Sequence, residues 1–426
     1  MPDIPGMPVG AQQLPLPQAM LPIISHAHSA STNSGRQRRS RWNRCGDMHR
    51  AYGQNACLPT LEQAPTGLNP IHERPRAPAH LYLTTLPAVT AMNYRHAFHA
   101  GNFADVLKHT VMLALIEAMQ SKSTPFCLIE THAGSGCYAL DGREAGKTGE
   151  FKDGISRLLY PDLHASGAKS GSLPPLLRRW LDSILAIPGN EDGLKVYPGS
   201  PLQAANAMRP NDSAQLCELH PEEATQLQAL FHRDARIHVH QRDGYEALNA
   251  LIPPKEKRGL VLIDPPYEAQ EAEYKRIEQA IKASMQRWPT GVYAIWYPIK
   301  QRSQVQPFLR WLPRSGAKRV LRAELMVYPD ESPIRLNGSG MVILNAPWKL
   351  DEVLREPMQA MARLLSRERP AEWRLDWLLQ EGAEPPAPSP LPRSRLLATR
   401  DPASRPTSSR TPSTRPPRGT GPGRPR

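Results

Sequence analysis

A short apolar strand that ends abruptly constrains this chain more than any other feature. Residues 259–263 read Gly-Leu-Val-Leu-Ile and run directly into Asp264-Pro265-Pro266-Tyr267. An unbroken apolar run of this length is typical of a strand buried on both faces, in the middle of a parallel sheet. The prolines have no backbone N–H to donate, so the strand stops there. Asp264 is therefore expected at the carboxyl edge of the sheet, where open α/β folds bind ligands.

The Asp-Pro-Pro-Tyr tetrapeptide has the groups needed to activate an amine on a nucleobase. Such an amine is a poor nucleophile, because its lone pair is delocalised into the ring. The Asp264 carboxylate and the Pro265 carbonyl could accept its two hydrogens, and both prolines would hold these acceptors in place. Tyr267 could stack on the base. The tetrapeptide resembles the motif of amino-directed, S-adenosylmethionine-dependent methyltransferases, and the alternative is an ordinary Pro-Pro turn after a strand.

A glycine turn follows the first predicted strand, residues 126–129. The strand leads into Glu130 and then into Gly134-Ser135-Gly136. Glycines let the backbone approach a ligand closely, and this first turn holds the cofactor in nucleotide-binding α/β folds. A third glycine at the expected spacing is missing, which argues against a dinucleotide fingerprint.

Acidic residues follow the next two predicted strands. Glu218 ends the strand 214–217 and could bind both ribose hydroxyls of a nucleoside cofactor. Asp243-Gly244 follow the strand 237–240, and the carboxylate could accept from the adenine amino group. Each residue has a simpler alternative, a surface acid or a turn former. The order of glycine turn, acid, Asp-Gly and Asp-Pro-Pro-Tyr makes that alternative improbable for the set.

The remaining pattern predicts a doubly wound α/β sheet with a small helical insertion. A fifth strand is expected at 291–298, and an antiparallel hairpin at 319–328 and 338–344 completes the sheet. Residues 150–196 carry a helical apolar stripe and form the insertion. After it, Ser200 is predicted to cap a helix that has Pro201 at its first position.

The block Met92–His109 begins the predicted folded part. A helix is expected from Asn102, which could cap it, and the polar aromatic residues before it suggest a binding loop. A zinc site built from His96, His99 and His109 is the alternative. We do not expect a metal, because no carboxylate or thiolate stands at a familiar spacing.

The charge of the chain lies mostly at its ends. The net charge is +13, of which residues 393–426 carry +8 and residues 1–91 carry +4. Both ends lack apolar periodicity, so we expect 1–91 to be a disordered extension or a misassigned start, and 381–426 to be a disordered Pro/Arg-rich tail. The folded domain is then predicted at 92–380, with a net charge near zero.

Compartment and assembly can be predicted only in outline. The sequence has no apolar stretch long enough to span a bilayer, and no secretory signal is recognisable. The five cysteines form no CxxC pair, which is consistent with a reducing cytoplasm without structural disulfides. We expect a cytoplasmic monomer that does not contact membranes.

From Met92 to about Gln380 the chain resembles the RlmJ family of 23S ribosomal RNA adenine-N6 methyltransferases. The matching motifs are Tyr94-Arg95-His96 through Lys108-His109, Thr131-His132-Ala133-Gly134, Tyr197-Pro198-Gly199-Ser200-Pro201, Glu218-Leu219-His220-Pro221, Asp243-Gly244 and Asp264-Pro265-Pro266-Tyr267. The resemblance implies a class I Rossmann-like methyltransferase fold, S-adenosylmethionine as cofactor, 23S ribosomal RNA as partner and methylation without metal.

The resemblance also implies residue roles, carried over by motif. Asp264 would be the catalytic acceptor. Lys108, Tyr94 and His96 would lie near the substrate or the cofactor entrance. The cofactor would be held by His109, His132, Ser200, Glu218, Asp243, Gly244 and Asp264.

Two other functions fit part of this pattern. A DNA adenine-N6 methyltransferase would use the same pocket, and a matched RNA and DNA assay separates the two. A non-catalytic RNA-binding protein with a relic nucleoside site is the other, and the presence of both Asp-Pro-Pro-Tyr and the cofactor acids argues against it. Because the adenine must leave any stack to enter a pocket, RNA free of ribosomal protein is the expected substrate.

Overall fold

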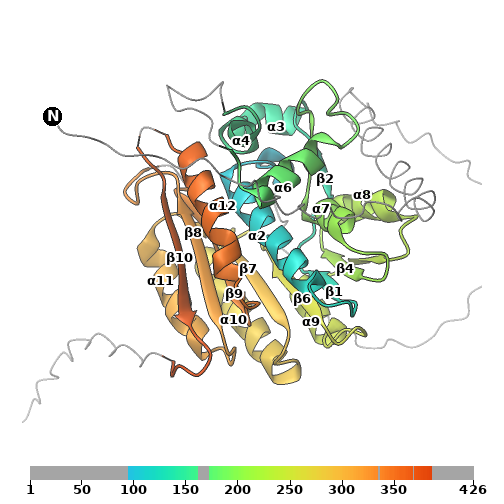
Figure 1. Cartoon of the computed structure of the whole chain (residues 1–426). Coiled ribbons are helices and arrows are strands. Elements are labelled where there is room, and N and C mark those ends of the chain that lie inside the picture. Colours follow the sequence, from blue (N-terminus) through green and yellow to red (C-terminus); the bar gives the residue numbers. More distant parts are fainter. Residues whose placement is uncertain (1–94, 162–171, 334–335, 368, 386–426) are drawn as a thin grey trace, which may run out of the picture. The chain divides into compact units, whose positions relative to one another are not determined.

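A mixed eight-stranded sheet organises the chain, in the strand order β10-β8-β9-β7-β6-β1-β4-β5 (Figure 1). The structure, a computed structural model, describes residues 95–161, 172–333, 336–367 and 369–385, so Tyr94, the predicted extension 1–91 and residues 386–426 of the predicted tail lie outside the described residues. The strands of this sheet are β1 (Cys127–Glu130), β4 (Ser213–Glu218), β5 (Ile237–Gln241), β6 (Gly259–Ile263), β7 (Val292–Ile299), β8 (Val320–Met326), β9 (Gly338–Leu344) and β10 (Glu372–Leu379).

The strand that precedes Asp264 is central, as predicted. All of β6 is buried, and it pairs in parallel with β1 on one side and β7 on the other. β4 and β5 extend the parallel half, while β8 and β9 form the predicted antiparallel hairpin. The α/β fold class is confirmed. The eighth strand, β10, was not predicted, although Trp373, Leu375, Trp377 and Leu379 alternate along it as in a strand that buries one face.

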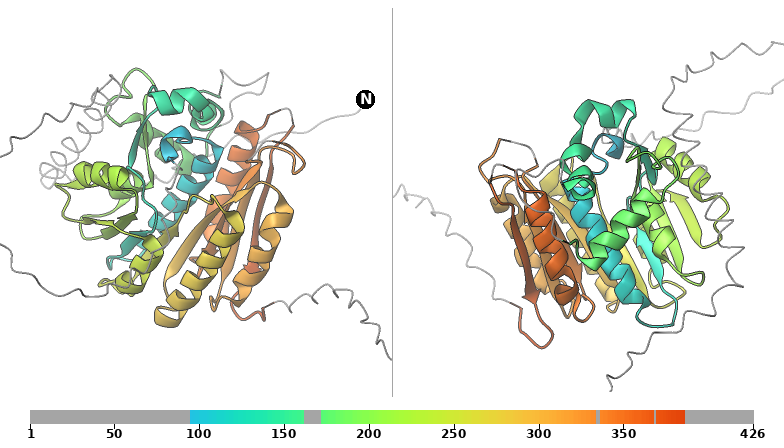
Figure 2. Two further views of the ribbon diagram at one scale, coloured as in Figure 1. Left: turned by 180° about the vertical axis from the view of Figure 1, so that it is seen from behind. Right: turned by 45° about the horizontal axis from the view of Figure 1, so that its top comes forward.

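Helices cover both faces of the sheet and bury two apolar clusters between them and the strands (Figures 1 and 2). On one face α2 (Phe103–Gln120) packs beside α12 (Leu350–Leu364), and α7 (Ser200–Ala207) and α8 (Pro221–Phe231) continue this layer. The other layer contains α9 (Gly244–Leu251), α10 (Gln270–Arg287), α11 (Arg302–Trp311) and the short turn η3 (Leu312–Arg314).

The start of α2 shows how local sequence places the site. Asn102 caps this helix as predicted, since its Oδ1 accepts from Ala104 N at 2.9 Å and from Asp105 N at 3.0 Å. The short turn η1 (His96–Phe98) precedes it. The cap sets where α2 begins, and so it places Asp105, Lys108 and His109 along the buried first turns of the helix.

A small helical region interrupts the sheet pattern, as expected. It consists of α3 (Arg143–Thr148), η2 (Glu150–Asp153), α4 (Ile155–Leu159) and α6 (Pro175–Leu185). The structure adds a two-stranded antiparallel sheet of β2 (Cys137–Ala139) and β3 (Val196–Pro198) that flanks this region. The strand β3 was not predicted, because three-residue strands are too short to show a period. Gly199 stands at the N-cap of α7 and Ser200 is the first residue of that helix, so the prediction that Ser200 caps it is wrong.

Cys127 in β1 and Cys217 in β4 are free thiols, and both are buried. In the described part of the chain no helix is both long and apolar enough to cross a membrane.

Candidate active site

A cavity opens at the carboxyl ends of the parallel strands. The predicted residues that line it are His96, Lys108, His109, His132, Gly134, Ser200, Glu218, Asp243, Gly244, Asp264 and Pro266. The structure therefore brings most of the predicted site together. It also adds Glu223, Glu273 and Arg276, which the sequence did not indicate.

Asp264 is held by a lysine from α2. Lys108 Nζ lies 2.5 Å from Asp264 Oδ2 and 2.9 Å from Asp105 Oδ1, and its side chain is only 6% exposed. The lysine therefore bridges two carboxylates, one on the helix and one at the end of β6. Because Lys108 contacts Oδ2, the other oxygen of Asp264 is the one available to accept a hydrogen from a substrate amine.

Asp105 anchors this arrangement from behind. Its Oδ2 accepts from Gly101 N at 2.8 Å and lies 3.0 Å from His96 Nε2. Burial alone would raise the pKa of the Asp105 carboxyl, but His96 and Lys108 outweigh burial and hold that pKa well below its usual value. An ionised Asp105 fixes Lys108 in place, and Lys108 in turn orients Asp264.

Glu218 holds the glycine turn after β1 through a backbone hydrogen bond. Its Oε2 accepts from Gly134 N at 2.8 Å, and its Oε1 accepts from His220 N at 2.7 Å. Gly134 has a φ of +62°, and a Cβ built there would lie 2.3 Å from the Tyr138 hydroxyl. Only glycine fits this position, so the turn can close tightly against the cavity.

Asp243 makes more contacts within the protein than the sequence predicted. Its Oδ1 caps α9 by accepting from Tyr245 N at 2.9 Å and from Glu246 N at 3.2 Å. Arg276 Nη2 donates to Oδ2 at 2.8 Å, and the guanidinium lies 4.7 Å from the Tyr245 ring. The role expected for Asp243, acceptance from an adenine amino group, therefore requires that Arg276 share or leave Oδ2.

Two histidines in the cavity are neutral. Burial lowers the pKa of His109 to about 3 and the pKa of His132 to about 4. His109 Nδ1 accepts from Gln203 Nε2 at 2.9 Å, which leaves the proton on Nε2. That Nε2 is buried and has no hydrogen-bond partner in the structure. A donor without a partner at a cavity wall suits a bound polar ligand.

Tyr267 is placed differently from the expectation. It is only 3% exposed, it does not line the cavity, and its hydroxyl donates to the Trp296 carbonyl at 2.6 Å. Its ring packs against Tyr274 and Trp296, since a large aromatic side chain gains most by burial. Tyr267 thus supports the Asp-Pro-Pro-Tyr loop from behind. Stacking of Tyr267 on a substrate base stays a prediction.

The histidines considered for zinc contact acids instead. His96 Nε2 lies 3.0 Å from Asp105 Oδ2, and His99 Nδ1 lies 2.9 Å from Glu150 Oε1. Within the described ranges no group of at least three His, Cys, Asp or Glu side chains could hold a metal ion.

Glu130 is a buried acid whose role the sequence did not assign. It is fully buried at the end of β1; Ser200 Oγ donates to its Oε2 at 2.8 Å, while Oε1 has no partner in the structure. Burial raises the pKa of Glu130 from 4.5 to about 8, with a smaller contribution from Asp264. Its position directly before the glycine turn was the signal in the sequence.

We expect the difference in stability between the Glu130→Gln variant and the unchanged protein to shift in favour of the variant as the pH rises. Between pH 4.5 and about 8 the folded protein keeps a proton on Glu130 that the unfolded chain loses. The free energy of unfolding of the unchanged protein therefore falls as the pH rises through this range. The slope for one proton is about 1.4 kcal/mol per pH unit. Thermal unfolding of both proteins at several pH values between these limits measures the difference. A constant difference across the range would contradict a protonated Glu130.

The charge of the cavity suits a cationic nucleoside cofactor. Its carboxyl groups are Glu218, Glu223, Asp243, Asp264 and Glu273, and its cations are Lys108 and Arg276. Burial raises the pKa of Glu223 to about 7, so the other four carry most of the negative charge. S-adenosylmethionine has a sulfonium, an ammonium and a carboxylate and is a cation overall, so an acidic wall favours it. The tight glycine turn and the unpartnered donor of His109 fit the same cofactor.

Comparisons with known proteins decide the family. The family model described as "Ribosomal RNA large subunit methyltransferase D, RlmJ" matches residues 123–379, more than half of the chain. This chain belongs to the RlmJ family. The matched range contains β1, the cavity acids and Asp-Pro-Pro-Tyr, while the predicted N-terminal block precedes it.

Two RlmJ relatives match a longer part of the chain than the family model does. Ribosomal RNA large subunit methyltransferase J of Escherichia coli is 38% identical over 291 residues, which is 68% of this chain and all of that protein. The protein of the same name from Haemophilus influenzae is also 38% identical, over 290 residues. A crystal structure of protein LPL1258 from Legionella pneumophila matches with a TM-score of 0.58 and 35% identity, covering 65% of this chain and 98% of that one.

RlmJ membership confirms four predictions. The chain has the expected methyltransferase fold, it belongs to an enzyme family, the cofactor of that family is S-adenosylmethionine, and the family reaction is adenine-N6 methylation of 23S ribosomal RNA. The roles of individual residues are a separate matter and rest on the geometry above.

Proposed function

We propose that this chain transfers a methyl group to the N6 amine of one adenine in 23S ribosomal RNA, with Asp264 as the catalytic acceptor. One observation carries the assignment of the site. Asp264 ends the central strand β6, and Lys108 fixes one of its oxygens inside the cavity that also contains Glu218 and Asp243. Family membership supports the reaction and the substrate class.

The residues of the chain act mainly by position. The free oxygen of Asp264 and the Pro265 carbonyl accept the two amine hydrogens and direct the nitrogen lone pair into the cavity. Bound S-adenosylmethionine would supply an activated methyl group. Holding the amine in line with that group accounts for most of the rate, because the leaving group needs little help. Asp264 also stabilises the positive charge that develops on the amine.

The cofactor roles follow the arrangement around the glycine turn. Glu218 faces the expected ribose position, and Asp243 and Gly244 form the adenine end of the cavity. His109, His132 and Ser200 line the remaining wall. Tyr94, which lies outside the described residues, His96 and Lys108 are assigned to the substrate entrance.

The form of the substrate is part of the proposal. The target adenine must leave any stack to reach Asp264, so ribosomal RNA free of ribosomal protein is expected to be the better substrate. We further propose that the enzyme acts as a monomer in the cytoplasm, where ribosomal RNA is made.

A matched assay tests this function against its alternatives. The full chain is incubated with radiolabelled S-adenosylmethionine and, separately, with protein-free 23S RNA, assembled large subunits or duplex DNA of the same sequence. We expect methyl transfer to the free RNA at N6 of adenine. Preferred transfer to DNA would support the DNA methyltransferase alternative. Cofactor binding without transfer to any substrate would support the relic site.

We predict that residues 92–392 suffice for folding and for catalysis. The described elements begin at His96 and end at Leu379, and they include the whole cavity. This shortened chain is compared with the full chain by melting temperature and by RNA methylation. The Arg-rich ends could still attract RNA, in which case the shortened chain has a higher KM chiefly at low salt. Loss of folding, or a large drop in kcat, would contradict the prediction. Chains 1–392 and 92–426 serve as controls for each end.

A further inference from the structure

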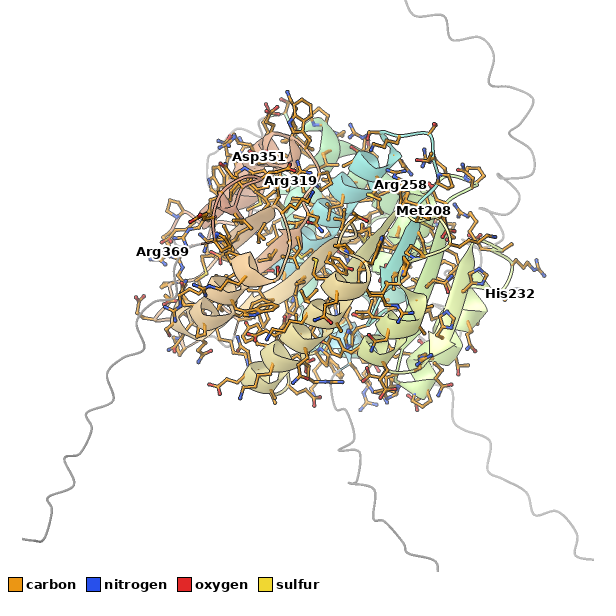
Figure 3. All side chains as sticks on the ribbon, turned by 90° about the horizontal axis from the view of Figure 1, so that it is seen from below. Met208, His232, Arg258, Arg319, Asp351 and Arg369 are labelled. Atoms are coloured by element: carbon orange, nitrogen blue, oxygen red, sulfur yellow. The ribbon has the colours of Figure 1, made fainter. Side chains whose placement is uncertain are left out.

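A second, larger cavity lies at the opposite edge of the sheet from the active site. It has a volume of about 830 Å³, and we call it the basal groove. The end of α2, the starts of β6 and β7 and the start of α12 form its walls, with Gly259, Val292 and Leu350 among the lining residues. β6 separates Gly259 from Asp264, a span of roughly 17 Å at 3.3 Å per residue. Figure 3 views this edge, with Arg258 and Arg319 labelled.

The basal groove is basic, although the folded part of the chain is nearly neutral. Its charged lining residues are Lys122, Lys257, Arg258, Lys318 and Arg319, against Glu117 and Glu381. Glu117 is already paired with Arg179 at 2.8 Å, and Arg319 approaches Glu381 only to 3.9 Å. Most of the positive charge in the groove is therefore not neutralised by its own acids.

Three lysines of the groove have no acidic partner among the residues that the structure describes. They are Lys122, Lys257 and Lys318, and all three are exposed. Arg258, in contrast, is fixed, because its guanidinium donates to the carbonyls of Thr124 at 2.6 Å and Met119 at 2.7 Å. Arg258 therefore adds positive charge to the groove, while the three lysines are the donors available to a chain of phosphates.

An exposed tryptophan stands at the rim of the groove. Trp348 is 76% exposed, the highest value among the large apolar side chains in the described part. Val353 beside it is 48% exposed, and Lys349 Nζ lies 4.6 Å from the centre of the Trp348 ring. An indole left in water next to a basic groove is the arrangement on which unpaired bases stack.

We propose that the basal groove binds an unpaired segment of the RNA substrate, remote from the target adenine. The lysines would contact phosphates, and a base would stack on Trp348. Charge favours RNA over a protein partner, since Lys122, Lys257 and Lys318 have no acidic partner among the described residues. Lys349, the cation beside Trp348, is paired with Glu352 at 3.3 Å and is not part of this free charge. The inference rests on the proposed function only in taking RNA as the substrate, and it adds a second contact that selects long RNA over a short fragment.

The test uses a probe that cannot occupy the adenine site. A fluorescent oligouridylate of about 12 nucleotides matches the length that single-strand sites cover and contains no adenine. It is titrated with the full chain, with Lys257→Gln/Lys318→Gln and with the control Lys275→Gln/Lys282→Gln. The control lysines are exposed on α10 and do not line the groove. Both variants lose the same net charge.

We expect the groove variant to bind the probe about tenfold more weakly at low salt, with a salt slope lower by about 1.4. The control should match the unchanged protein. Trp348→Ala should weaken binding about tenfold, and Trp348→Phe should restore most of it. Equal affinities for the groove and control variants would overturn the proposal. So would a groove variant that keeps its RNA affinity but loses a protein partner.

A parallel kinetic measurement separates this proposal from the proposed function. With 23S RNA the groove variant should show a raised KM, while its kcat and its affinity for S-adenosylmethionine stay unchanged. If the unchanged protein methylates no RNA, the proposed function fails, but the oligouridylate titration still tests whether the basal groove binds RNA. If methylation is normal and the groove variant has an unchanged KM, only the groove proposal fails.

Discussion

Asp264→Ala is expected to lower kcat about 100- to 1,000-fold, the cost of losing one preorganised charged contact in a transition state. In the proposed reaction the carboxylate faces the amine that gains positive charge, and Lys108 lies 2.5 Å from it. The affinity for S-adenosylmethionine should change little, because the proposed cofactor contacts lie mainly at Glu218 and Asp243. Single-turnover kinetics on ribosomal RNA and calorimetry with the cofactor measure the two effects separately.

Asp264→Asn is the matched control for shape. It keeps the size of the side chain and one carbonyl oxygen but removes the charge that Lys108 and the amine both need. We expect it to lose most of the activity as well, with a melting temperature close to that of the unchanged protein. An alanine variant that retained more than half of kcat would contradict the assigned role of Asp264.

Glu218→Ala is expected to weaken S-adenosylmethionine binding about 10- to 100-fold. A hydrogen bond to a charged group contributes about 1.5–3 kcal/mol, and about 1.4 kcal/mol corresponds to a tenfold change. In the structure Glu218 also holds Gly134 N at 2.8 Å, so its loss loosens the glycine turn. Calorimetry with the cofactor and RNA-binding titrations should show that the cofactor is affected more than RNA.

Glu222→Ala is the control for Glu218. It removes an acid from the first turn of α8, where the side chain is 65% exposed and paired with Arg95. We expect cofactor affinity close to that of the unchanged protein. Unchanged affinity in Glu218→Ala as well would rule out a ribose contact at this position.

The parts of the site that follow strands could be predicted from sequence. Asp264 stands directly after an apolar run, Glu218 ends the strand predicted at 214–217, and Asp243 follows the strand predicted at 237–240 by two residues. The carboxyl ends of parallel strands meet at one edge of a sheet. Position along the chain was therefore enough to bring these acids together.

The parts that depend on packing could not be predicted. Arg276 lies on an outer helix, and nothing in its local sequence indicates that it reaches Asp243. Tyr267 was expected to face a base, but burial against Trp296 competes with that role and decides its orientation here. The raised pKa of Glu130 likewise arises from complete burial, which a strand pattern suggests only in part.

Mapping N6-methyladenine in 23S ribosomal RNA tests the central claim most directly. Ribosomal RNA is isolated from cells with the protein, from cells without it and from cells that express only Asp264→Ala, and fragments are compared by mass spectrometry. We predict one adenine whose N6 methyl group is present in the first sample and absent from the other two. A methylation pattern identical in all three samples would contradict the assignment.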